Sequence, residues 1–382
     1  MQQVGSSERP NLLIILSDQL RRDALGIYGD PNVSTPNIDR LASQGVRFGN
    51  ACSTYPICVP TRFSMMTGEY AHSRFVPAIE WRLSPAERTL ADEFNEAGYH
   101  TMYCGKWHLF GGHGLLPNHP ARKANLTWVP PEYQGRWKKW LGFELANNPF
   151  DTYYFEDADP TPRPLGKYQT DGLFELTIDH LKGRLGAEQP FCCLLSVEPP
   201  HFPLAAPEAF ISRWEGREIE LPANFLYRDE YPAPGQKLAE KDREEAIRKR
   251  RIYYAMIENL DWNVGRMLTF LEESGLAHNT IVILLSDHGQ MDGAHSEASL
   301  DKQHPFEESI GIPLIIRDPR SERRAGVIIE DPLCTEDLYP TFLGLAGLES
   351  RAEKPGMDIT PVMRGELAAL PARGYCWSSS TN

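Results

Sequence analysis

The chain alternates continuous apolar runs with amphipathic segments up to about residue 345. Four runs stand out: LLIILSDQ (12–19), PFCCLLSVEPPH (190–201), IVILLSDH (281–288) and IPLIIR (312–317). Apolar runs of this length predict strands that are buried on both faces, as in a parallel sheet. The amphipathic segments between them predict helices, so the pattern indicates an α/β layered fold.

The segments between the runs carry the signals of helix ends. Cap, proline and glycine positions predict helices over 35–45, 84–98 and 240–273. In the second of these helices, Ser84 and Glu87 predict a capping box. The third is the longest, and it is charged in its first half and amphipathic in its second.

Residues 109–168 depart from this alternation, because they are rich in Gly, Pro and aromatic residues. Linkers are seldom so aromatic, and long irregular segments in compact domains are usually functional. Two interpretations stay open for this segment. It is either a functional insertion beside a site or a small satellite core under a loop.

The composition describes an acidic chain with enough apolar residues for a large core. The 382 residues are 41% hydrophobic, and the formal net charge is −13. This charge argues against a nucleic-acid or anionic-membrane partner, although a local cationic site can still bind an anionic substrate.

The start of the chain lacks the pattern of a signal peptide, and no apolar run is long enough to span a membrane. As given, the sequence predicts a cytoplasmic protein, or a periplasmic or secreted one if a signal peptide has been removed. The oligomeric state stays open.

Polar side chains follow two of the predicted strands at the point where each strand ends. Asp18 and Gln19 come after the first run, and Asp287 and His288 come after the third. The carboxyl ends of parallel strands meet at one edge of a sheet, where open α/β folds keep their sites. Carboxylate and amide oxygens suit a hard divalent cation, and manganese also tolerates imidazole. The two pairs therefore predict a metal site.

The stretch CVPTR (58–62) places a cysteine ahead of a proline and an arginine. The chain has seven cysteines and no C-x-x-C pair, which predicts reduced core thiols. Pro60 suits the first turn of a short helix that ends at Gly68, so Cys58 lies at a helix N-terminus, where the dipole favours an anion. Arg62 follows one turn later. A reactive thiolate is one interpretation, and a buried cysteine beside a structural arginine is the other; spacing alone favours the second.

A family resemblance favours a functional interpretation of Cys58 over a structural one. CVPTR matches the C-x-P-x-R signature of the type I, formylglycine-dependent sulfatases of the alkaline phosphatase superfamily. CGKWH (104–108) resembles the second signature of that family, and SDHG (286–289), EESIGIPLIIR (307–317) and TPNIDRLASQGVRF (35–48) resemble further blocks. The resemblance spans about residues 11 to 345.

The resemblance implies an alkaline-phosphatase-like α/β fold. This fold has a large, mostly parallel central sheet flanked by helices, and here the C-terminal subdomain is reduced or missing. We expect a sulfatase α/β catalytic domain over 8–350, with 109–168 as its aromatic-rich insertion. Residues 351–382 are then the start of a reduced or truncated C-terminal subdomain.

The resemblance also implies the site residues and their roles. A formylglycine-generating enzyme oxidises the motif cysteine to Cα-formylglycine during maturation. A calcium ion, with manganese as the alternative, is bound by Asp18, Gln19, Cys58 (as formylglycine), Asp287 and His288. The implied catalytic residues are Cys58, Arg62, Lys106, His108, His201 and Lys302. Arg62 and Lys106 hold the formylglycine and the sulfate, His108 contacts the formylglycine hydroxyls, and His201 and Lys302 lie near the leaving-group oxygen.

The activity that this implies is hydrolysis of sulfate monoesters through a formylglycine nucleophile and a covalent sulfate hemiester. We favour a sulfated carbohydrate as the substrate, because sugar faces stack on aromatic rings and residues 109–168 are rich in them. Trp81 and Arg82 are candidates for the mouth of the same pocket.

Two alternatives remain. Many family members carry aspartate at the position of Gln19; with His288, this departure resembles phosphonate monoester hydrolases. A phosphonate monoester or phosphodiester hydrolase on the same scaffold is therefore the alternative enzyme, although Lys106 and His108 match sulfatases better. An inactive metal-binding scaffold is the alternative of another class. It requires an unconverted Cys58 or a missing ligand, and every ligand position is filled.

Overall fold

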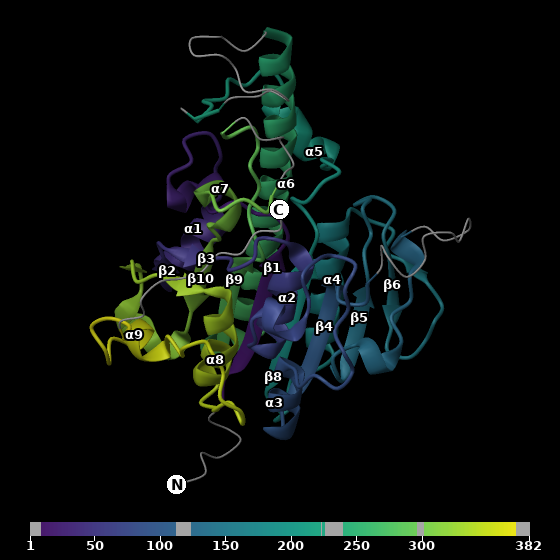
Figure 1. The fold of residues 1–382 in the computed structure, drawn as a ribbon, viewed down its shortest axis with the longest axis vertical. Helices are drawn as coiled ribbons and strands as arrows, with labels where there is room; N and C mark the ends of the chain where they lie inside the picture. Colours follow the sequence, from purple (N-terminus) through teal and green to yellow (C-terminus); the bar gives the residue numbers. More distant parts are fainter. Residues whose placement is uncertain (1–8, 112–123, 223, 226–239, 296–301, 372–382) are drawn as a thin grey trace.

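The computed structural model describes residues 9–111, 124–222, 224–225, 240–295 and 302–371. Its main sheet contains β1 (Asn11–Ser17), β2 (Val46–Phe48), β4 (His100–Lys106), β5 (Lys139–Phe143), β6 (Tyr153–Glu156), β7 (Arg163–Pro164), β8 (Phe191–Val197), β9 (Thr280–Ser286), β10 (Leu314–Arg317) and β11 (Val327–Ile329). The strand order is β11-β2-β10-β9-β1-β8-β4-β5-β6-β7 (Figure 1). A separate pair is formed by β3 (Ala51–Cys52) and β12 (Leu333–Cys334).

The centre of the main sheet is parallel. Strands β9, β1, β8, β4 and β5 all run in the same direction. Strand β10 runs antiparallel between β9 and β2, and β6 and β7 add an antiparallel edge. This arrangement confirms the predicted large, mostly parallel sheet.

Helices cover both faces of the sheet. One layer contains α1 (Pro36–Ser43), α4 (Gln169–Lys182) and α6 (Glu240–Glu273), and the other contains α2 (Cys58–Thr67), α3 (Leu90–Glu96) and α8 (Thr335–Leu345). Three short helices, α5 (Glu208–Ile211), α7 (Glu307–Ile310) and α9 (Thr360–Arg364), complete the set in the described residues.

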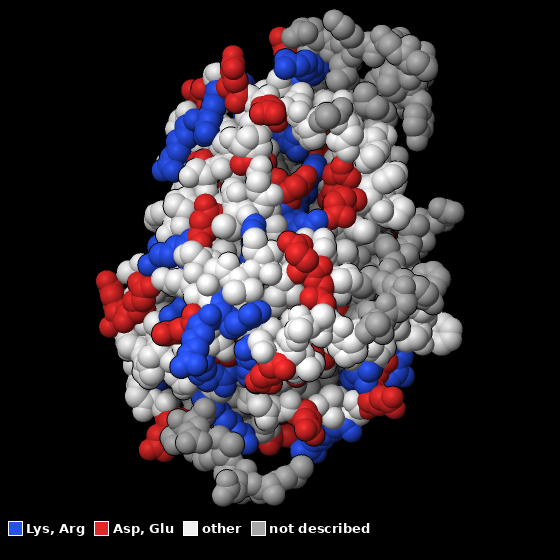
Figure 2. All heavy atoms as spheres, turned by 90° about the vertical axis from the view of Figure 1, so that its left-hand side faces the viewer, with Lys and Arg blue, Asp and Glu red and all other residues white. Residues whose placement is uncertain are grey.

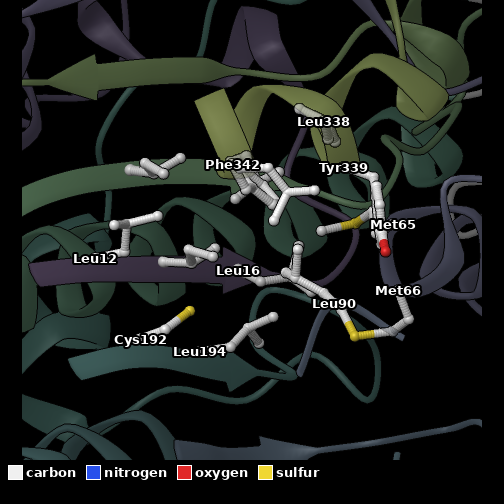
Figure 3. Close-up of a cluster of buried hydrophobic side chains, with 14 of the residues drawn as sticks. Leu12, Leu16, Met65, Met66, Leu90, Cys192, Leu194, Leu338, Tyr339 and Phe342 are labelled. Atoms are coloured by element: carbon white, nitrogen blue, oxygen red, sulfur yellow. The ribbon is translucent and has the colours of Figure 1, made fainter. Parts of the chain in front are cut away.

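The side chains of β1 show how the sequence makes these layers. Successive side chains of a strand point to opposite faces. Leu13 and Ile15 accordingly pack in the core with α1, α4 and α6, whereas Leu12 and Leu16 pack in the core with α2, α3 and α8. Figure 3 shows the second core, in which β1 lies across from Phe342 of α8. A strand that is buried on both faces must be apolar throughout, which is why this run contains no alternating polar positions.

The predicted helices exist, but one begins later than predicted. The expected start at Ser84 is wrong, because residues 84–88 form a turn in which the Glu87 amide donates to the Ser84 carbonyl. The helix α3 begins at Leu90, where Thr89 and Asp92 form the capping box. That second box directly precedes the buried stripe of the helix, so packing selects it over the first.

The aromatic-rich segment continues the main sheet through β5 and β6. Trp137 and Trp140 are 5% and 1% exposed. The ring of Trp140 stacks on Tyr103 at a centroid distance of 5.1 Å and meets Trp107 edge-on at 5.3 Å. These rings form a packed core, as the satellite-core interpretation expects, and they are not available to a substrate. Residues 112–123 of the segment lie outside the described residues.

Three further observations bear on the sequence predictions. Of the described cysteines, Cys58, Cys104, Cys192 and Cys193 are buried free thiols, and Cys376 lies outside the described residues. Within the described residues, no helix has the length and apolarity to cross a membrane. On the face in Figure 2, acidic and basic side chains are interspersed, so the charge of −13 does not form one large acidic patch there.

The domain boundary near residue 350 stays a prediction, although Met363 of α9 packs in the same core as α8.

Candidate active site

The strand register brings the predicted residues together at one edge of the sheet. Ser17 of β1 pairs with Ser286 of β9 on one side and with Val197 of β8 on the other. Asp18 and Asp287 therefore leave the sheet at the same level. Lys106 is the last residue of β4, the next strand along, and belongs to the same edge.

A cysteine-headed helix meets this edge. The helix α2 begins at Cys58 and ends at Thr67, and Gly68 follows it with a left-handed φ of 70°. The thiol of Cys58 lies 3.1 Å from His288 Nε2 and 3.5 Å from Asp18 Oδ1. Ligand atoms of Asp18, Cys58, Asp287 and His288 all lie within 4.8 Å of one another, and all four residues are buried. The structure thus gathers four of the five predicted metal ligands into one cluster.

Gln19, the fifth predicted ligand, lies at the border of this cluster. Its backbone amide donates to Asp287 Oδ1 at 3.1 Å. Its side-chain Nε2 donates to Gln290 Oε1 at 2.8 Å, and its Oε1 accepts a hydrogen bond from Lys302 Nζ at 3.0 Å. Gln290 therefore fixes which end of the amide faces Lys302.

Two buried cations balance the carboxylates. Arg62 donates through Nε to Asp287 Oδ2 at 3.1 Å and through Nη2 to Asp18 Oδ2 at 3.2 Å. Its Nη1 donates to Ser196 Oγ at 2.8 Å. Lys106 Nζ lies 2.7 Å from Asp18 Oδ2 and is fully buried, yet it makes no well-directed hydrogen bond within the described part of the chain. Arg62 thus fixes the acidic pair, whereas the ammonium of Lys106 has donors left for a ligand.

The charges of the site shift its titration. Burial and Asp18 oppose ionisation of the Cys58 thiol, but Lys302, Lys106 and His288 outweigh them and lower its pKa. Burial alone raises the pKa of the Asp18 carboxyl, and the nearby cations, led by Lys106, hold it well below its usual value. Burial disfavours the charged form of Lys106, but Asp18 and Cys58 raise its pKa. Anionic groups at position 58 are therefore stabilised.

His201 and Lys302 meet beside Cys58. Lys302 Nζ lies 3.4 Å from Cys58 Sγ and 3.2 Å from His201 Nε2. His201 Nδ1 lies 2.6 Å from the Phe202 carbonyl oxygen, so Nδ1 carries the proton and Nε2 accepts from the lysine. Burial and the nearby Lys302 charge both lower the pKa of His201 well below its usual value. The imidazole is therefore neutral and holds the ammonium toward position 58.

His108 is buried two residues beyond Lys106, with a left-handed φ of 51°. Its backbone amide donates to the Glu144 carbonyl at 2.9 Å. The contacts around Cys58 described above do not include its ring, so its role in the chemistry stays a prediction.

Sequence reasoning missed three buried residues that support the site. Ser196 accepts from Arg62, Gln290 orients Gln19, and Glu198 lies 3.5 Å from Lys106 Nζ while it accepts hydrogen bonds from two backbone amides. Each one adjoins a motif that was recognised: LLSVEPPH contains the first and third, and Gln290 follows SDHG. For Ser196 and Glu198 the available signal was a polar residue at the end of a buried strand, whereas Gln290 follows β9 by four residues and carried no such signal.

The fold and the site together define a hydrolase of the alkaline phosphatase superfamily. The family model Sulfatase matches residues 10–348. The ulvan-active sulfatase of Formosa agariphila is 32% identical over 365 residues, which cover 95% of this chain and 67% of that protein. The N-acetylglucosamine-6-O-sulfatase of Bacteroides thetaiotaomicron is 25% identical over 430 residues, which cover 95% of this chain and 72% of that protein. The chain belongs to the sulfatase family and is a sulfuric ester hydrolase.

Solved structures agree with this assignment. The putative sulfatase yidJ from Bacteroides fragilis aligns with a TM-score of 0.81 at 28% identity, over 96% of this chain and 80% of that one. The phosphonate monoester hydrolase of Agrobacterium radiobacter aligns with a TM-score of 0.69 at 27% identity, over 96% of this chain and 79% of that one. The alkaline-phosphatase-like fold is confirmed. The family also implies a formylglycine and a metal ion, for which the cluster around Asp18 provides ligands.

Proposed function

We propose that this protein removes sulfate from sulfated carbohydrates through a formylglycine derived from Cys58. The observation that carries the proposal is the position of the Cys58 side chain. It lies at the start of α2, within 3.5 Å of Asp18, His288 and Lys302. In this structure, Cys58 Sγ marks the place of the formylglycine oxygens. Once converted, residue 58 supplies a hydrated aldehyde as nucleophile, and its second hydroxyl later allows the sulfate to leave.

The donor set around Cys58 fits a divalent cation. The oxygens of two buried carboxylates and a neighbouring amide are ligands that Ca²⁺ prefers, and Mn²⁺ also accepts the imidazole. We propose Ca²⁺ held by Asp18, Asp287, Gln19 and residue 58, with His288 completing the set and Mn²⁺ as the alternative. A bound cation supplies positive charge that lowers the pKa of the nucleophilic hydroxyl and stabilises sulfate oxygens.

The surrounding side chains supply the remaining chemistry. Lys106 donates to the non-bridging sulfate oxygens, since its ammonium has free donors inside a fully buried site. Lys302 gives a proton from Nζ to the leaving alcohol, and His201 orients it by accepting through Nε2. His108 takes the proton from the second hydroxyl of residue 58. The oxygen of that hydroxyl then forms the aldehyde C=O while the C–O bond to the sulfate breaks, so sulfate leaves and water does not need to attack the sulfur atom.

Maturation sets a condition on folding. Cys58 and Arg62 are each only 1% exposed, so an enzyme that reads C-x-P-x-R cannot reach them in the folded protein. We therefore propose that the formylglycine-generating enzyme acts on the chain before α2 packs.

A carbohydrate substrate is supported by the relatives. One similar protein is named for ulvan and another for N-acetylglucosamine 6-sulfate. The buried tryptophans of the aromatic segment cannot provide the sugar contact, so the exposed residues around the site must do so.

The first test is the chemical state of residue 58. Protein expressed with a formylglycine-generating enzyme is digested with trypsin, and the peptide over 48–62 is analysed by mass spectrometry. We expect formylglycine at position 58 in active protein and no multiple turnover by Cys58→Ser, because a serine has no second hydroxyl. Repeated turnover by unconverted protein or by Cys58→Ser would contradict the mechanism.

The second test separates this function from the phosphonate alternative, which the similarity to a phosphonate monoester hydrolase supports. The kcat/KM values for an aryl sulfate, a sulfated sugar and an aryl phosphonate monoester are compared on the converted enzyme. We expect the two sulfates to be preferred. A preference for the phosphonate would favour the alternative hydrolase, and no turnover of any substrate by converted, metal-loaded protein would favour the inactive scaffold.

A further inference from the structure

Arg82 lies beside the chain segment that carries His108. Arg82 and Phe110 form an isolated antiparallel β-bridge, and the Leu83 amide donates to the Leu109 carbonyl at 2.8 Å. Phe110 follows His108 by two residues, a distance of at most about 7 Å along an extended chain. The same segment begins at Lys106, whose Nζ lies 2.7 Å from Asp18 Oδ2, so the bridge places Arg82 beside the chain that leaves the site, where we expect a sugar unit that adjoins the reacting one.

The guanidinium of Arg82 is held over an aromatic ring. Its Cζ lies 5.0 Å from the centroid of the Tyr133 ring, and that ring packs on Phe110 at a centroid distance of 4.9 Å. Stacking covers one face of a guanidinium and leaves its N–H groups, which lie in the plane, free to bind. Arg82 is exposed, so these donors face solvent. The contact orients the cation without neutralising it.

Arg82 also differs from the arginines of the same region in its ion pairs. Three of them have a carboxylate partner: Arg74 with Glu69, Arg88 with Glu93 and Arg136 with Asp92. Among the described residues, no carboxylate lies within ion-pairing distance of Arg82. An oriented, uncompensated guanidinium beside the active site of an acidic protein is a binding group for an anion.

The geometry points to a second anion subsite, in which Arg82 binds an additional sulfate or carboxylate group on the saccharide whose sulfate ester is cleaved. The substrate class is then a polyanionic saccharide. The neighbouring Trp81, 47% exposed, offers a ring face to the sugar that carries the second anion. The inference rests on the proposed function, because it requires a carbohydrate at the active site.

The test compares three oligosaccharides that share the reacting sulfate. One has no other charge, the second carries an additional sulfate, and the third carries a uronate carboxylate. For the two dianionic substrates we expect Arg82→Gln to lower kcat/KM about tenfold or more, chiefly through KM, the range of a charge-assisted hydrogen bond. Loss on only one of the two identifies the group that Arg82 binds. The singly charged sugar and an aryl sulfate should be unaffected.

Two variants serve as controls. Arg82→Lys keeps the charge but loses the planar pair of donors, so it should recover part of the loss. Arg47→Gln removes a guanidinium that also lies 5.0 Å from a tyrosine ring, that of Tyr28, but it lies on β2, away from the site residues. It should leave all kinetic constants unchanged. Added salt should weaken the preference of the wild type for dianionic substrates and have less effect on Arg82→Gln.

The possible failures are distinguishable. If the wild type cleaves the three saccharides equally and Arg82→Gln changes none of them, the subsite is wrong and the proposed function stands. An equal loss on the aryl sulfate also overturns the subsite, because Arg82 then acts on the reacting sulfate or on the fold. If the converted wild type cleaves the aryl sulfate but no saccharide, the carbohydrate part of the proposed function fails first.

Discussion

Asp261 of α6 caps a different helix, and its burial makes the stability of the protein depend on pH. Its Oδ1 accepts hydrogen bonds from the backbone amides of Asn37 and Ile38, at the N-terminus of α1, at 2.9 and 2.8 Å. Its Oδ2 accepts from Asn37 Nδ2 at 2.9 Å. Burial nevertheless outweighs these bonds and raises the pKa of Asp261 from 3.8 to about 6.

The size of the effect follows from that shift. Between pH 4 and 6 the folded protein keeps a proton on Asp261 that the unfolded chain has lost. Stability contributed by the protonated form is therefore complete below pH 4 and is lost as the pH rises through 6. A shift of about two pKa units corresponds to about 3 kcal/mol. Asp261→Asn cannot titrate, and its amide oxygen can still accept from both backbone amides. The free energy of unfolding of Asp261→Asn minus that of the wild type should therefore increase by about 2 to 3 kcal/mol as the pH rises from 4 to 7.

The assay is urea unfolding of the wild type and Asp261→Asn at several values of pH from 4 to 7. Asp92 provides a control of opposite sign, because burial raises its pKa but the hydrogen bonds from Arg136 and the Thr89 amide outweigh burial and lower it. Asp92→Asn should therefore cost more stability at pH 7 than at low pH. A constant difference between Asp261→Asn and the wild type across this range would refute the reasoning about burial.

Three further predictions concern the site. Lys106→Met should lower kcat/KM for an aryl sulfate, which corresponds to a loss of about 2 to 4 kcal/mol of transition-state stabilisation. Circular dichroism checks that the variant is folded, and a smaller loss would mean that Lys106 only balances the charge of Asp18. His108→Ala should release one equivalent of phenol from an aryl sulfate and then stop, in a pre-steady-state measurement; steady turnover without a burst would remove His108 from the second step. Gln19→Asp should bind Ca²⁺ more tightly relative to Mn²⁺ in a competition titration, and an unchanged ratio would exclude Gln19 from the metal shell.

The sequence predicted the location of the site because strand ends are local features. The apolar runs ending in Asp18 and Asp287 had to be neighbouring strands for the two carboxylates to meet, and the register of Ser17 with Ser286 confirms this. The place of Cys58 at the start of α2 followed from the proline and glycine around it. These predictions required only periodicity and helix-end chemistry.

Side-chain partners could not be predicted in the same way. The pairing of Arg62 with both carboxylates depends on where α2 lies against the sheet, which no local pattern specifies. Thr35 precedes α1 as expected, but its hydroxyl bonds to Asp39, and the capping carboxylate comes from Asp261, 224 residues away from Asn37. The aromatic segment stayed ambiguous for the same reason, since a tryptophan in a sheet and one on a rim have the same local sequence.

The contacts of Gln19 explain how an amide at this position, where many family members carry aspartate, affects the charge of Lys302. Its Oε1 lies 3.0 Å from Lys302 Nζ, the group that we propose protonates the leaving alcohol. A carboxylate in that place would form an ion pair with the ammonium and draw its charge away from residue 58, whereas a neutral amide only accepts a hydrogen bond. Gln290 fixes the amide in this orientation. The two carboxylates of the cluster are then paired by Arg62, and the ammonium of Lys302 stays directed at position 58. Sugar alcohols are poor leaving groups and need that proton most, so this arrangement supports the proposal of a sulfated carbohydrate as the substrate.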